Sequence, residues 1–200
     1  MTDRAPYVIG ITGNIACGKS LVSSILADLG AEVIDADLVA HEMMKSGSDV
    51  LKQIANRFGD DVLNDDGSLN RPALGQIVFG DPSALAELEQ LTHPPTVREI
   101  LRRTREASAP AVVIDAIKLY EAGLAEHCDQ TWVVYCDPDV QRKRLIDRNE
   151  LTPEQAQQRI DAQPPQSEKV RRADVVIDNS GSRDDTRASV IEAWNLLPIT

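Results

Sequence analysis

Eight consecutive residues near the start of the chain have the types and spacing of a phosphate-binding loop. Gly13, Gly18, Lys19 and Ser20 occupy the fixed positions of the pattern G-x-x-x-x-G-K-[ST]. In such a loop the backbone amides surround phosphate oxygens, the lysine contacts the β- and γ-phosphates, and the hydroxyl binds Mg²⁺. We therefore expect ATP or a similar nucleoside triphosphate, with Ser20 as the metal ligand. The residues expected to bind the nucleotide are Gly13, Asn14, Ile15, Ala16, Cys17, Gly18, Lys19, Ser20 and Leu21.

Cys17 lies inside this loop, where two roles are open to a cysteine. A nucleophilic thiol needs a neighbouring base, and no histidine lies nearby in the sequence. We therefore interpret Cys17 as a small residue that presents its backbone amide. For the motif as a whole, the alternative is an ordinary glycine turn followed by a surface lysine, which would not require the flanking strand and helix.

Short apolar runs separated by helical stretches indicate an α/β fold. The helix after the loop is predicted from apolar residues at helical spacing between Leu21 and Leu29, with a stop at Gly30. We expect a three-layer P-loop NTPase fold with a doubly wound, parallel, five-stranded sheet. The five predicted strands are residues 7–12, 32–35, 111–115, 130–135 and 174–178.

Two regions interrupt this core. Residues 38–110 show mainly helical spacing of apolar residues, with turn signals at Asp65-Asp66-Gly67 and Asp81-Pro82, which indicates a helical insertion. Residues 139–172 are polar and rich in Arg and Gln, which indicates a mobile two-helix segment over the site. The nucleotide-binding core then comprises residues 1–37, 111–138 and 173–200.

The composition limits the class of protein. A chain of 200 residues with 42% hydrophobic content suits one α/β core with a modest insertion. The net charge of −11 argues against a broad basic surface, so we expect no nucleic-acid and no membrane partner. Three cysteines without zinc-site spacing indicate reduced thiols. With no signal-peptide pattern and no apolar span, we expect a cytoplasmic protein, monomeric or weakly homo-oligomeric.

Two carboxylates follow the second predicted strand, at the sheet edge where open α/β folds bind ligands. If strand alternation continues through Asp37, the side chains of Asp35 and Asp37 point the same way. Asp37 is then a candidate general base for an attacking hydroxyl, with Asp35 as its support. The alternative is that Asp37 only caps a helix beginning near Leu38.

Several further motifs follow the phosphate loop in a fixed order. They are Val33-Ile34-Asp35-Ala36-Asp37, Arg71-Pro72-Ala73-Leu74 before Ile77-Val78-Phe79, His93-Pro94, Glu121-Ala122-Gly123-Leu124, Gln141-x-x-Arg144-Leu145-x-x-x-Arg148, and Val176-Ile177-Asp178-Asn179-Ser180-Gly181. This order resembles the dephospho-CoA kinase family, nearly from end to end. The resemblance implies phosphorylation by ATP of the ribose 3′-hydroxyl of dephospho-CoA, which gives coenzyme A and ADP.

The resemblance also implies where the acceptor binds. It makes residues 38–110 the acceptor-binding domain and residues 139–172 a lid. Arg71 is then expected to hold an acceptor phosphate and His93 to contact the acceptor, although His93-Pro94-Pro95 is also expected to break a helix. The residues expected to bind the acceptor are Asp35, Asp37, Arg71, His93, Lys118 and Glu121.

The chain departs from the family pattern at two places. Asn14 stands where a second glycine is usual, and asparagine tolerates a left-handed backbone better than most residues. Ile117-Lys118 stands where Pro-Leu is common. Lys118 could pair with a substrate phosphate or a neighbouring carboxylate, or it could face outward.

Arginines of the polar segment are candidates for the positive charge that phosphoryl transfer requires. Arg144 and Arg148 are four residues apart, so they share one face of a helix. We expect both to reach the ATP phosphates, and we expect Arg144 to be catalytic together with Lys19 and Asp37. The remaining basic residues, Arg142, Lys143, Arg159, Arg171 and Arg172, are typical of solvated charges.

Asn179 follows the last predicted strand, and it lies either against the adenine or in a plain turn. Two other functions also remain open at this point. Another small P-loop kinase, such as one for nucleoside monophosphates, would share the loop and the lid but show other acceptor motifs. A non-kinase ATP-binding protein would have no need of the paired carboxylates or the arginine-rich lid.

Overall fold

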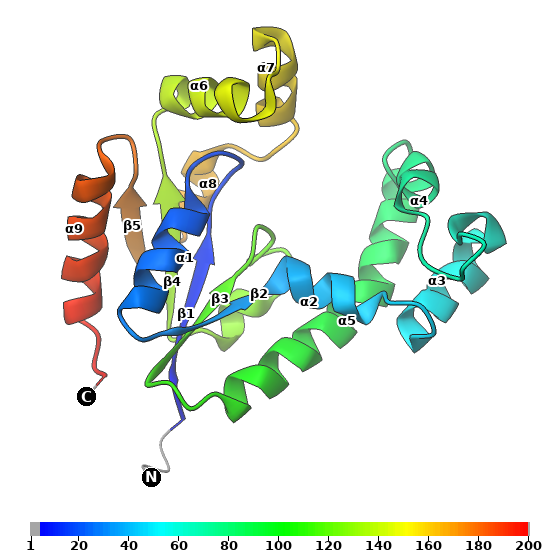
Figure 1. Ribbon diagram of the computed structural model, residues 1–200, viewed down its shortest axis with the longest axis horizontal. Coiled ribbons are helices and arrows are strands. Elements are labelled where there is room, and N and C mark those ends of the chain that lie inside the picture. Colours follow the sequence, from blue (N-terminus) through cyan, green and yellow to red (C-terminus); the bar gives the residue numbers. More distant parts are fainter. Residues whose placement is uncertain (1–4, 200) are drawn as a thin grey trace. The chain divides into compact units, whose positions relative to one another are not determined.

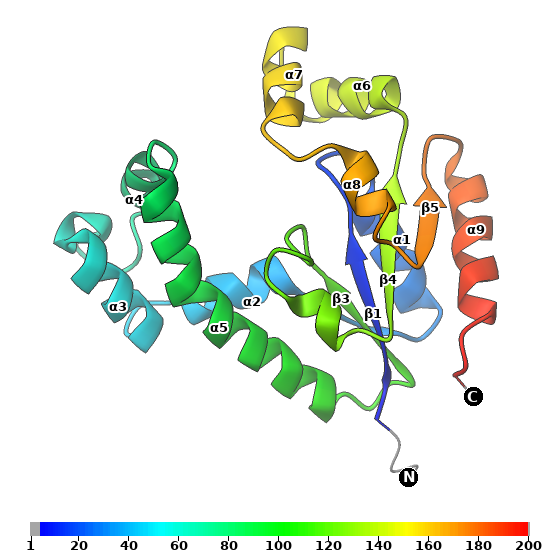
Figure 2. The ribbon, with the colours of Figure 1, turned by 180° about the vertical axis from the view of Figure 1, so that it is seen from behind.

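The protein contains a five-stranded sheet, and a computed structural model describes residues 5–199 (Figures 1 and 2). The strand order is β2-β3-β1-β4-β5, and the pairs β1–β3, β1–β4 and β4–β5 are parallel. Because the order reverses beside β1, the carboxyl end of β1 is the switch point where such sheets bind ligands. The strands are β1 (Tyr7–Thr12), β2 (Glu32–Asp35), β3 (Ala111–Asp115), β4 (Gln130–Tyr135) and β5 (Val175–Asp178).

Helices cover both faces of this sheet, which confirms the three-layer α/β fold. Helices α1 and α9 lie on one face, and α8 lies on the other (Figures 1 and 2). The helices are α1 (Lys19–Asp28), α2 (Ala36–Met43), α3 (Asp49–Phe58), α4 (Arg71–Val78), α5 (Pro82–Glu106), α6 (Pro138–Asn149), α7 (Pro153–Asp161), α8 (Gln166–Val170) and α9 (Arg183–Asn195), with short 3₁₀ turns at Asp60–Val62 and Leu124–His127.

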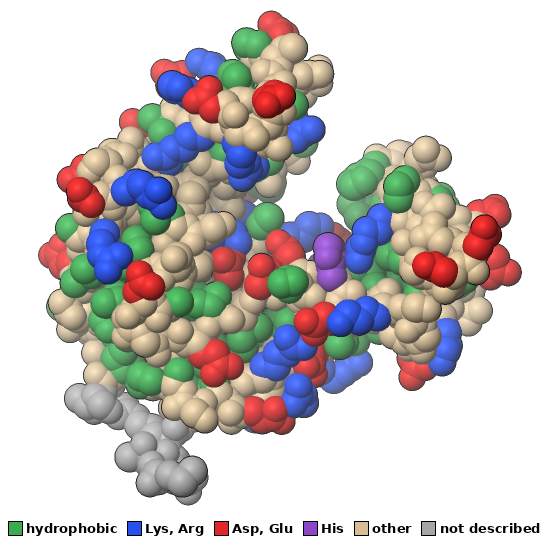
Figure 3. All heavy atoms as spheres, viewed as in Figure 1, with side chains coloured by type: hydrophobic (Ala, Val, Ile, Leu, Met, Phe, Trp, Pro, Cys, Tyr) green, Lys and Arg blue, Asp and Glu red, His purple; other side chains and the backbone are tan. Residues whose placement is uncertain are grey.

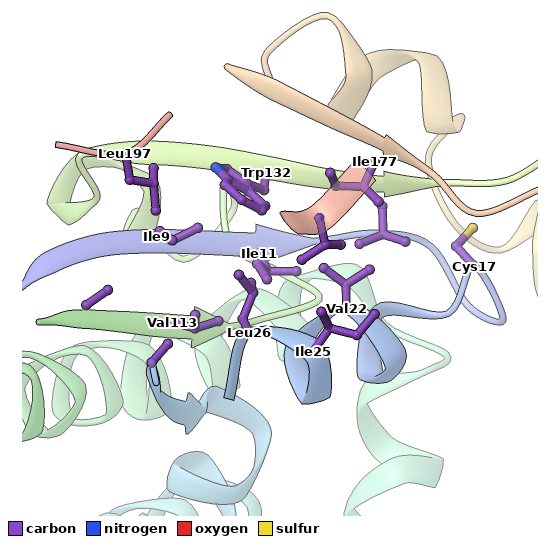
Figure 4. Close-up of a cluster of buried hydrophobic side chains, with 14 of the residues drawn as sticks. Ile9, Ile11, Cys17, Val22, Ile25, Leu26, Val113, Trp132, Ile177 and Leu197 are labelled. Atoms are coloured by element: carbon purple, nitrogen blue, oxygen red, sulfur yellow. The ribbon is translucent and has the colours of Figure 1, made fainter. Parts of the chain in front are cut away.

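The main core fills the space between the sheet and helices α1 and α9 (Figure 4). Ile9 and Ile11 of β1 are fully buried, as is Trp132 of β4. Val22 and Leu26, four residues apart on α1, pack into the same cluster. The continuous apolar run of β1 and the helical spacing of α1 are therefore explained by burial on both faces of the strand and on one face of the helix.

The chain divides into two compact units. The first contains the described residues up to Ile34 together with those from Thr104 onward, and the second is Asp35–Arg103. The second unit is helical and has its own apolar core, in which Ile54 and Val62 are fully buried. Below we call these the sheet unit and the helical unit.

The sequence predicted that His93-Pro94-Pro95 breaks a helix, and this prediction was wrong. A single helix, α5, spans Pro82–Glu106 with both prolines inside it. Thr92 and Thr96 flank the prolines, are buried, and donate from their hydroxyls to carbonyls four residues earlier, at 2.8 Å. Packing and these side-chain bonds maintain the helix although each proline removes one backbone donor. Figure 1 shows α5 bent along its length, as expected for a helix with internal prolines.

The polar segment after β4 also differs from the prediction of two helices. It contains three helices, because α8 follows α6 and α7 before the chain enters β5. Pro138 and Pro153 each stand in the first turn of a helix, and Thr152 and Gln155 form a capping box that starts α7. Among the described residues, no helix is both long enough and apolar enough to cross a membrane.

Candidate active site

The phosphate loop connects the end of β1 to the start of α1, as predicted. Gly18 is the residue before α1 and has the left-handed backbone angles φ 92° and ψ 26°. A Cβ atom at Gly18 would lie 1.9 Å from Nδ2 of Asn179, and one at Gly13 would lie 2.6 Å from the carbonyl oxygen of Val134. Both positions therefore require glycine, for reasons of space at Gly13 and of space and backbone conformation at Gly18.

The start of α1 suits an anion. All residues of α1 are described, and within it no side chain caps the first turn and no acidic residue stands there. The backbone amides of that turn therefore keep their partial positive charge for a ligand. A phosphate group is the ligand that such a loop and helix start bind most commonly.

Lys19 and Ser20 open this helix, and Lys19 forms an ion pair with Asp115 at the end of β3. The other carboxylate oxygen of Asp115 accepts a hydrogen bond of 2.6 Å from the hydroxyl of Ser23. Asp115 is buried, whereas Ser20 is exposed. Our sequence interpretation gave Asp115 no role. The available signal was its position at the carboxyl end of a strand, the same edge of the sheet at which the loop begins.

Cys17 is fully buried, which agrees with the interpretation of a small loop residue. Its thiol donates to Oε1 of Gln166 at 3.1 Å. A side-chain hydrogen bond with Cys136, together with burial, raises the pKa of the Cys17 thiol. The thiol therefore stays protonated at neutral pH and is a poor nucleophile.

Asn179 is buried directly behind the loop. Its Nδ2 donates to the carbonyl of Cys17 at 2.7 Å, and its Oδ1 accepts from the hydroxyl of Thr186 at 2.7 Å. The side chain is thus bonded to protein atoms at both ends. Contact with an adenine stays a prediction, and support of the phosphate loop is the role for which the structure gives contacts.

Three glutamines that we had assigned no role also contact the loop. Gln141, on α6, donates to the carbonyl of Ile15, and Gln163 accepts from the amide of Ile15, both at 2.8 Å. Gln166 contacts the thiol of Cys17. For Gln141 the sequence signal was its place in the motif Gln141-x-x-Arg144. For Gln163 and Gln166 it was only the glutamine content of the polar segment, which does not say which side chains turn inward.

The two candidate arginines of α6 differ in their surroundings. Arg144 is half-buried, and its Nη1 lies 3.9 Å from the position that a Cβ would take at Gly18. This Nη1 is buried without a hydrogen-bond partner among the described residues. Arg148 is exposed, and its Nε donates to Asn149 at 3.0 Å. The structure therefore brings Arg144 to the loop, and it gives Arg148 no such contact.

The basic residues of the segment that were predicted to be solvated are exposed: Arg142, Lys143, Arg159, Arg171 and Arg172. Figure 3 shows Lys and Arg side chains over α6 and α7. Arg142 pairs with Asp139 on the same helix, at 2.7 Å, and Lys143 pairs with Asp147 at 2.6 Å. Both basic side chains are exposed, as expected for solvated charges.

A buried lysine, Lys169 on α8, was also missed. Its Nζ donates to the carbonyl of Ile117 at 2.9 Å and lies 3.4 Å from the hydroxyl of Thr12. Burial lowers the pKa of Lys169, while the charge of Glu121 acts in the opposite direction. Because Thr12 ends β1 and Ile117 follows β3, Lys169 fixes α8 to the two strand ends that carry the phosphate loop and Asp115.

The paired carboxylates, Asp35 and Asp37, belong to the helical unit. The strand alternation considered above does not continue, because β2 ends at Asp35 and α2 begins at Ala36. Asp35 is the N-cap of α2, and its carboxylate accepts from the amides of Asp37 and Leu38 at 2.9 and 3.0 Å. The capping role left open for Asp37 is therefore held by Asp35, and the carboxylate of Asp37 is exposed in the first turn.

The remaining acceptor candidates are divided between the two units. Arg71 opens α4 after the N-cap Asn70 and is exposed, and His93 is half-buried on α5. Lys118 and Glu121 belong to the sheet unit, and both are exposed. A surface hollow of about 260 Å³ in the helical unit is lined by residues between Gly47 and Gly67. No predicted site residue is among those that line it, so this hollow is not the predicted site.

Comparisons with known proteins agree with this geometry. The family model for dephospho-CoA kinase matches residues 7–185. The dephospho-CoA kinase of Symbiobacterium thermophilum is 48% identical over 190 residues, which is 94% of this chain and 80% of the relative. A crystal structure from Thermus thermophilus superposes with a TM-score of 0.82 at 32% identity, over 97% of this chain and 100% of the other.

A second solved structure, the dephospho-CoA kinase from Campylobacter jejuni, has a TM-score of 0.69 and is 30% identical, with 94% of this chain and 95% of that chain covered. The match thus includes the phosphate loop, the helical unit and the polar segment together. On these grounds the chain belongs to the dephospho-CoA kinase family.

Proposed function

We propose that this chain transfers the γ-phosphoryl group of ATP to the ribose 3′-hydroxyl of dephospho-CoA, giving coenzyme A and ADP. Membership of the family supports ATP and dephospho-CoA as the two substrates. The observation that carries the proposal within the structure is the ion pair of Lys19 with Asp115, at the mouth of a glycine loop that leads into an uncapped helix. Such a site binds the phosphates of a nucleotide and leaves one lysine to meet the charge that develops during transfer.

We assign the nucleotide phosphates to the phosphate loop, residues Gly13–Leu21, and to the ammonium of Lys19. Phosphoryl transfer leaves little covalent work for the protein, so positioning and charge stabilisation supply most of the rate. Arg144 adds a second cation, because its buried Nη1 has no partner among the described residues and lies beside Gly18. Arg148 is assigned a smaller, solvent-exposed contribution.

The residues at the start of α1 also fit a magnesium ion. Ser20 and Asp115 offer hydroxyl and carboxylate oxygens, the ligand types that Mg²⁺ prefers. The described residues contain no group of three or more His, Cys, Asp or Glu side chains that could hold a metal ion by themselves. This agrees with Mg²⁺ that is held by one or two protein oxygens and by substrate phosphates. When bound, the ion neutralises charge on the β- and γ-phosphate oxygens.

We assign Asp37 as the general base that accepts the proton of the 3′-hydroxyl. Asp35 supports it by fixing the first turn of α2 through two hydrogen bonds to backbone amides. The carboxylate of Asp37 is exposed in the first turn of α2, where it can accept a proton from a hydroxyl within hydrogen-bond reach. Arg71, His93, Lys118 and Glu121 are assigned to binding of the acceptor.

We also assign a role to each part of the chain. We propose residues 1–37, 111–138 and 173–200 as the nucleotide-binding core, residues 38–110 as the acceptor domain, and residues 139–172 as the lid. The protein is proposed to act in the cytoplasm, because Cys17, Cys128 and Cys136 are free thiols. We propose that it acts as a monomer or weak homo-oligomer, without a nucleic-acid or membrane partner.

A coupled assay of ADP release tests the proposed reaction. ADP formation should require dephospho-CoA, and 3′-deoxy-dephospho-CoA should not replace it, because the reacting hydroxyl is absent. Phosphorylation of a nucleoside monophosphate at a comparable rate would favour the other kinase class. ADP release without any acceptor would favour a non-kinase ATP-binding protein.

A further inference from the structure

The phosphate loop is bonded to side chains that come from distant parts of the sheet unit. The amide of Ile15 donates to Oε1 of Gln163, and the carbonyl of Ile15 accepts from Nε2 of Gln141, both at 2.8 Å. The side-chain Nδ2 of Asn14 donates to the carbonyl of Pro164 at 2.8 Å. The loop is therefore fixed from outside at two neighbouring residues, through both the donor and the acceptor of one of them.

These bonds determine which way the loop amides face. A trans peptide bond is planar, so its carbonyl and its amide hydrogen point in opposite directions. The described residues contain no cis peptide bond. Because Gln141 holds the carbonyl of Ile15, the amide of Ala16 in the same peptide plane must point away from Gln141. Asn179 holds the carbonyl of Cys17 in the same manner, and this turns the amide of Gly18 away from Asn179.

The same region of the loop contains a strained residue. Ala16 has a φ of 62°, a left-handed conformation that costs free energy for any residue with a Cβ. Such a conformation persists only where the surroundings hold it. The bonds to Ile15 on one side and to Cys17 on the other are the contacts that hold it here.

Gln141 is itself held in one orientation. It is 1% exposed, and its Oε1 accepts from Nε2 of Gln166 at 3.0 Å. Gln166 in turn donates to the carbonyl of Cys136 at 3.1 Å and accepts from the backbone amide of Cys136 and from the thiol of Cys17. Since both ends of each carboxamide are bonded, Gln141 can present only its NH₂ group to the carbonyl of Ile15.

We propose, on the basis of the function proposed above, that Gln141 and Gln163 are positioning residues that hold the phosphate loop in the shape that binds ATP. They orient the peptide planes on either side of Ile15, so the loop amides face the phosphates before the nucleotide arrives. A loop that adopts this shape only part of the time binds nucleotide more weakly in proportion to that fraction. The acceptor and the chemical step do not depend on these bonds once ATP is seated.

The test replaces each glutamine with methionine, which keeps the length of the side chain and removes its hydrogen bonds. Gln141→Met should raise the dissociation constant of ATP by about tenfold and Gln163→Met by about threefold. The turnover number at saturating ATP and the KM for dephospho-CoA should stay within about twofold of wild type. Gln158→Met, at an exposed glutamine of α7, is the matched control and should change neither quantity.

Isothermal titration calorimetry with ATP gives the dissociation constant without any acceptor, so the result does not depend on the identity of the phosphorylated substrate. Wild-type ATP affinity in a folded Gln141→Met variant would overturn the proposal. An equal rise in the KM for dephospho-CoA would also overturn it, because that pattern indicates general disruption. If the buried Gln141 variant does not fold, Gln163→Met decides, since Gln163 is less buried, and unchanged ATP affinity there refutes the role.

Discussion

The phosphate loop and the acceptor-side residues of the helical unit are built in opposite ways. The loop is held by Asp115, Gln141, Gln163 and Asn179, side chains that lie far from it in the sequence. The acceptor candidates are positioned locally, as where Asp35 caps the helix that carries Asp37. The first arrangement fixes the shape of the site through side chains from several parts of the sheet unit, and the second leaves exposed side chains whose direction is set by one helix turn.

This difference determines how much of the protein each substrate must order when it binds. A nucleotide meets amides and cations that already face it, so little binding free energy is spent on ordering the loop. An acceptor meets exposed side chains such as Arg71, which lose rotamer freedom when they bind. Substitutions should therefore separate into effects on nucleotide binding, on the chemical step and on local stability.

Loss of the positive charge of Lys19 in the phosphate loop should have the largest effect. Lys19→Ala is expected to lower kcat/KM by about 10³-fold, because the ammonium stabilises charge on the transferring phosphoryl group. The fold should persist, since Asp115 keeps its hydrogen bond to Ser23. Steady-state kinetics and a circular-dichroism melt measure both quantities, with Lys143→Ala at an exposed ion pair as the control. Normal turnover by the folded variant would refute the assignment of the phosphate site.

A substitution at Asp37 on the acceptor side should lower the turnover number without weakening ATP binding. Asp37→Asn keeps the shape of the side chain but removes the proton acceptor, so kcat should fall by about 10²- to 10⁴-fold. The dissociation constant for ATP should not change, because Asp37 is assigned to the acceptor. Calorimetry with ATP alongside steady-state kinetics gives both values, and Asp61→Asn, an exposed aspartate of the helical unit, is the control. A collapse of ATP affinity would make Asp37 part of the nucleotide or metal site.

Arg144 and Arg148 allow a comparison within one helix, between a half-buried and an exposed arginine. Arg144→Ala should lower kcat by about 10²-fold, because its buried Nη1 lies beside Gly18. Arg148→Ala should change kcat by less than about threefold, since the exposed side chain is solvated. Neither change should strongly raise the KM for dephospho-CoA. A larger effect of Arg148 in kinetic assays would show that closure of the segment brings it to the phosphates.

The smallest effect is expected from the surface ion pairs of the helical unit. Hydrogen bonds from Arg102 and Arg103 hold the pKa of Glu99 at about 2, and Arg103 also pairs with Glu42 of α2. Because the folded-state pKa lies below the unfolded value, this stabilisation is present above about pH 4.5 and is lost as the pH falls from there toward 2.

Glu99→Gln should therefore lower the free energy of unfolding at pH 7 by less than about 1 kcal/mol, since the partner arginines are partly exposed. As the pH falls from about 4.5 toward 2, the variant should also lose less stability than the wild type. Thermal melts from pH 7 to pH 3 measure both effects. An unchanged pH dependence would show that these pairs do not contribute to folding, and Glu126→Gln at an exposed position is the control.

The sequence was sufficient to predict the features that depend on local pattern. Apolar runs predicted all five strands, and G-x-x-x-x-G-K-[ST] predicted the loop between β1 and α1. The resemblance of ordered motifs gave the family, which the comparisons confirm. These features are readable because each is determined by residues that are close together in the sequence.

Features that depend on packing between distant residues were missed. The break expected at His93-Pro94-Pro95 did not occur, because the tertiary packing of α5 outweighs the local preference of proline. Gln163 and Lys169 lie in a stretch that reads as a solvated segment, yet one bonds the phosphate loop and the other is buried at the strand ends. The partner of Gln163 is 148 positions away and that of Lys169 is 52 positions away, so no local pattern identifies them.

Some of the groups that shape the phosphate loop are synthesised long after the loop itself. Asn179 lies 162 positions after Cys17, and Pro164 lies 150 positions after Asn14. At about 5 to 20 residues per second, a ribosome needs roughly 8 to 32 s to add the chain between Cys17 and Asn179. Through this time the loop lacks the hydrogen bond by which Asn179 holds the carbonyl of Cys17. The loop therefore reaches the shape that we propose binds ATP only after Asn179 has been added.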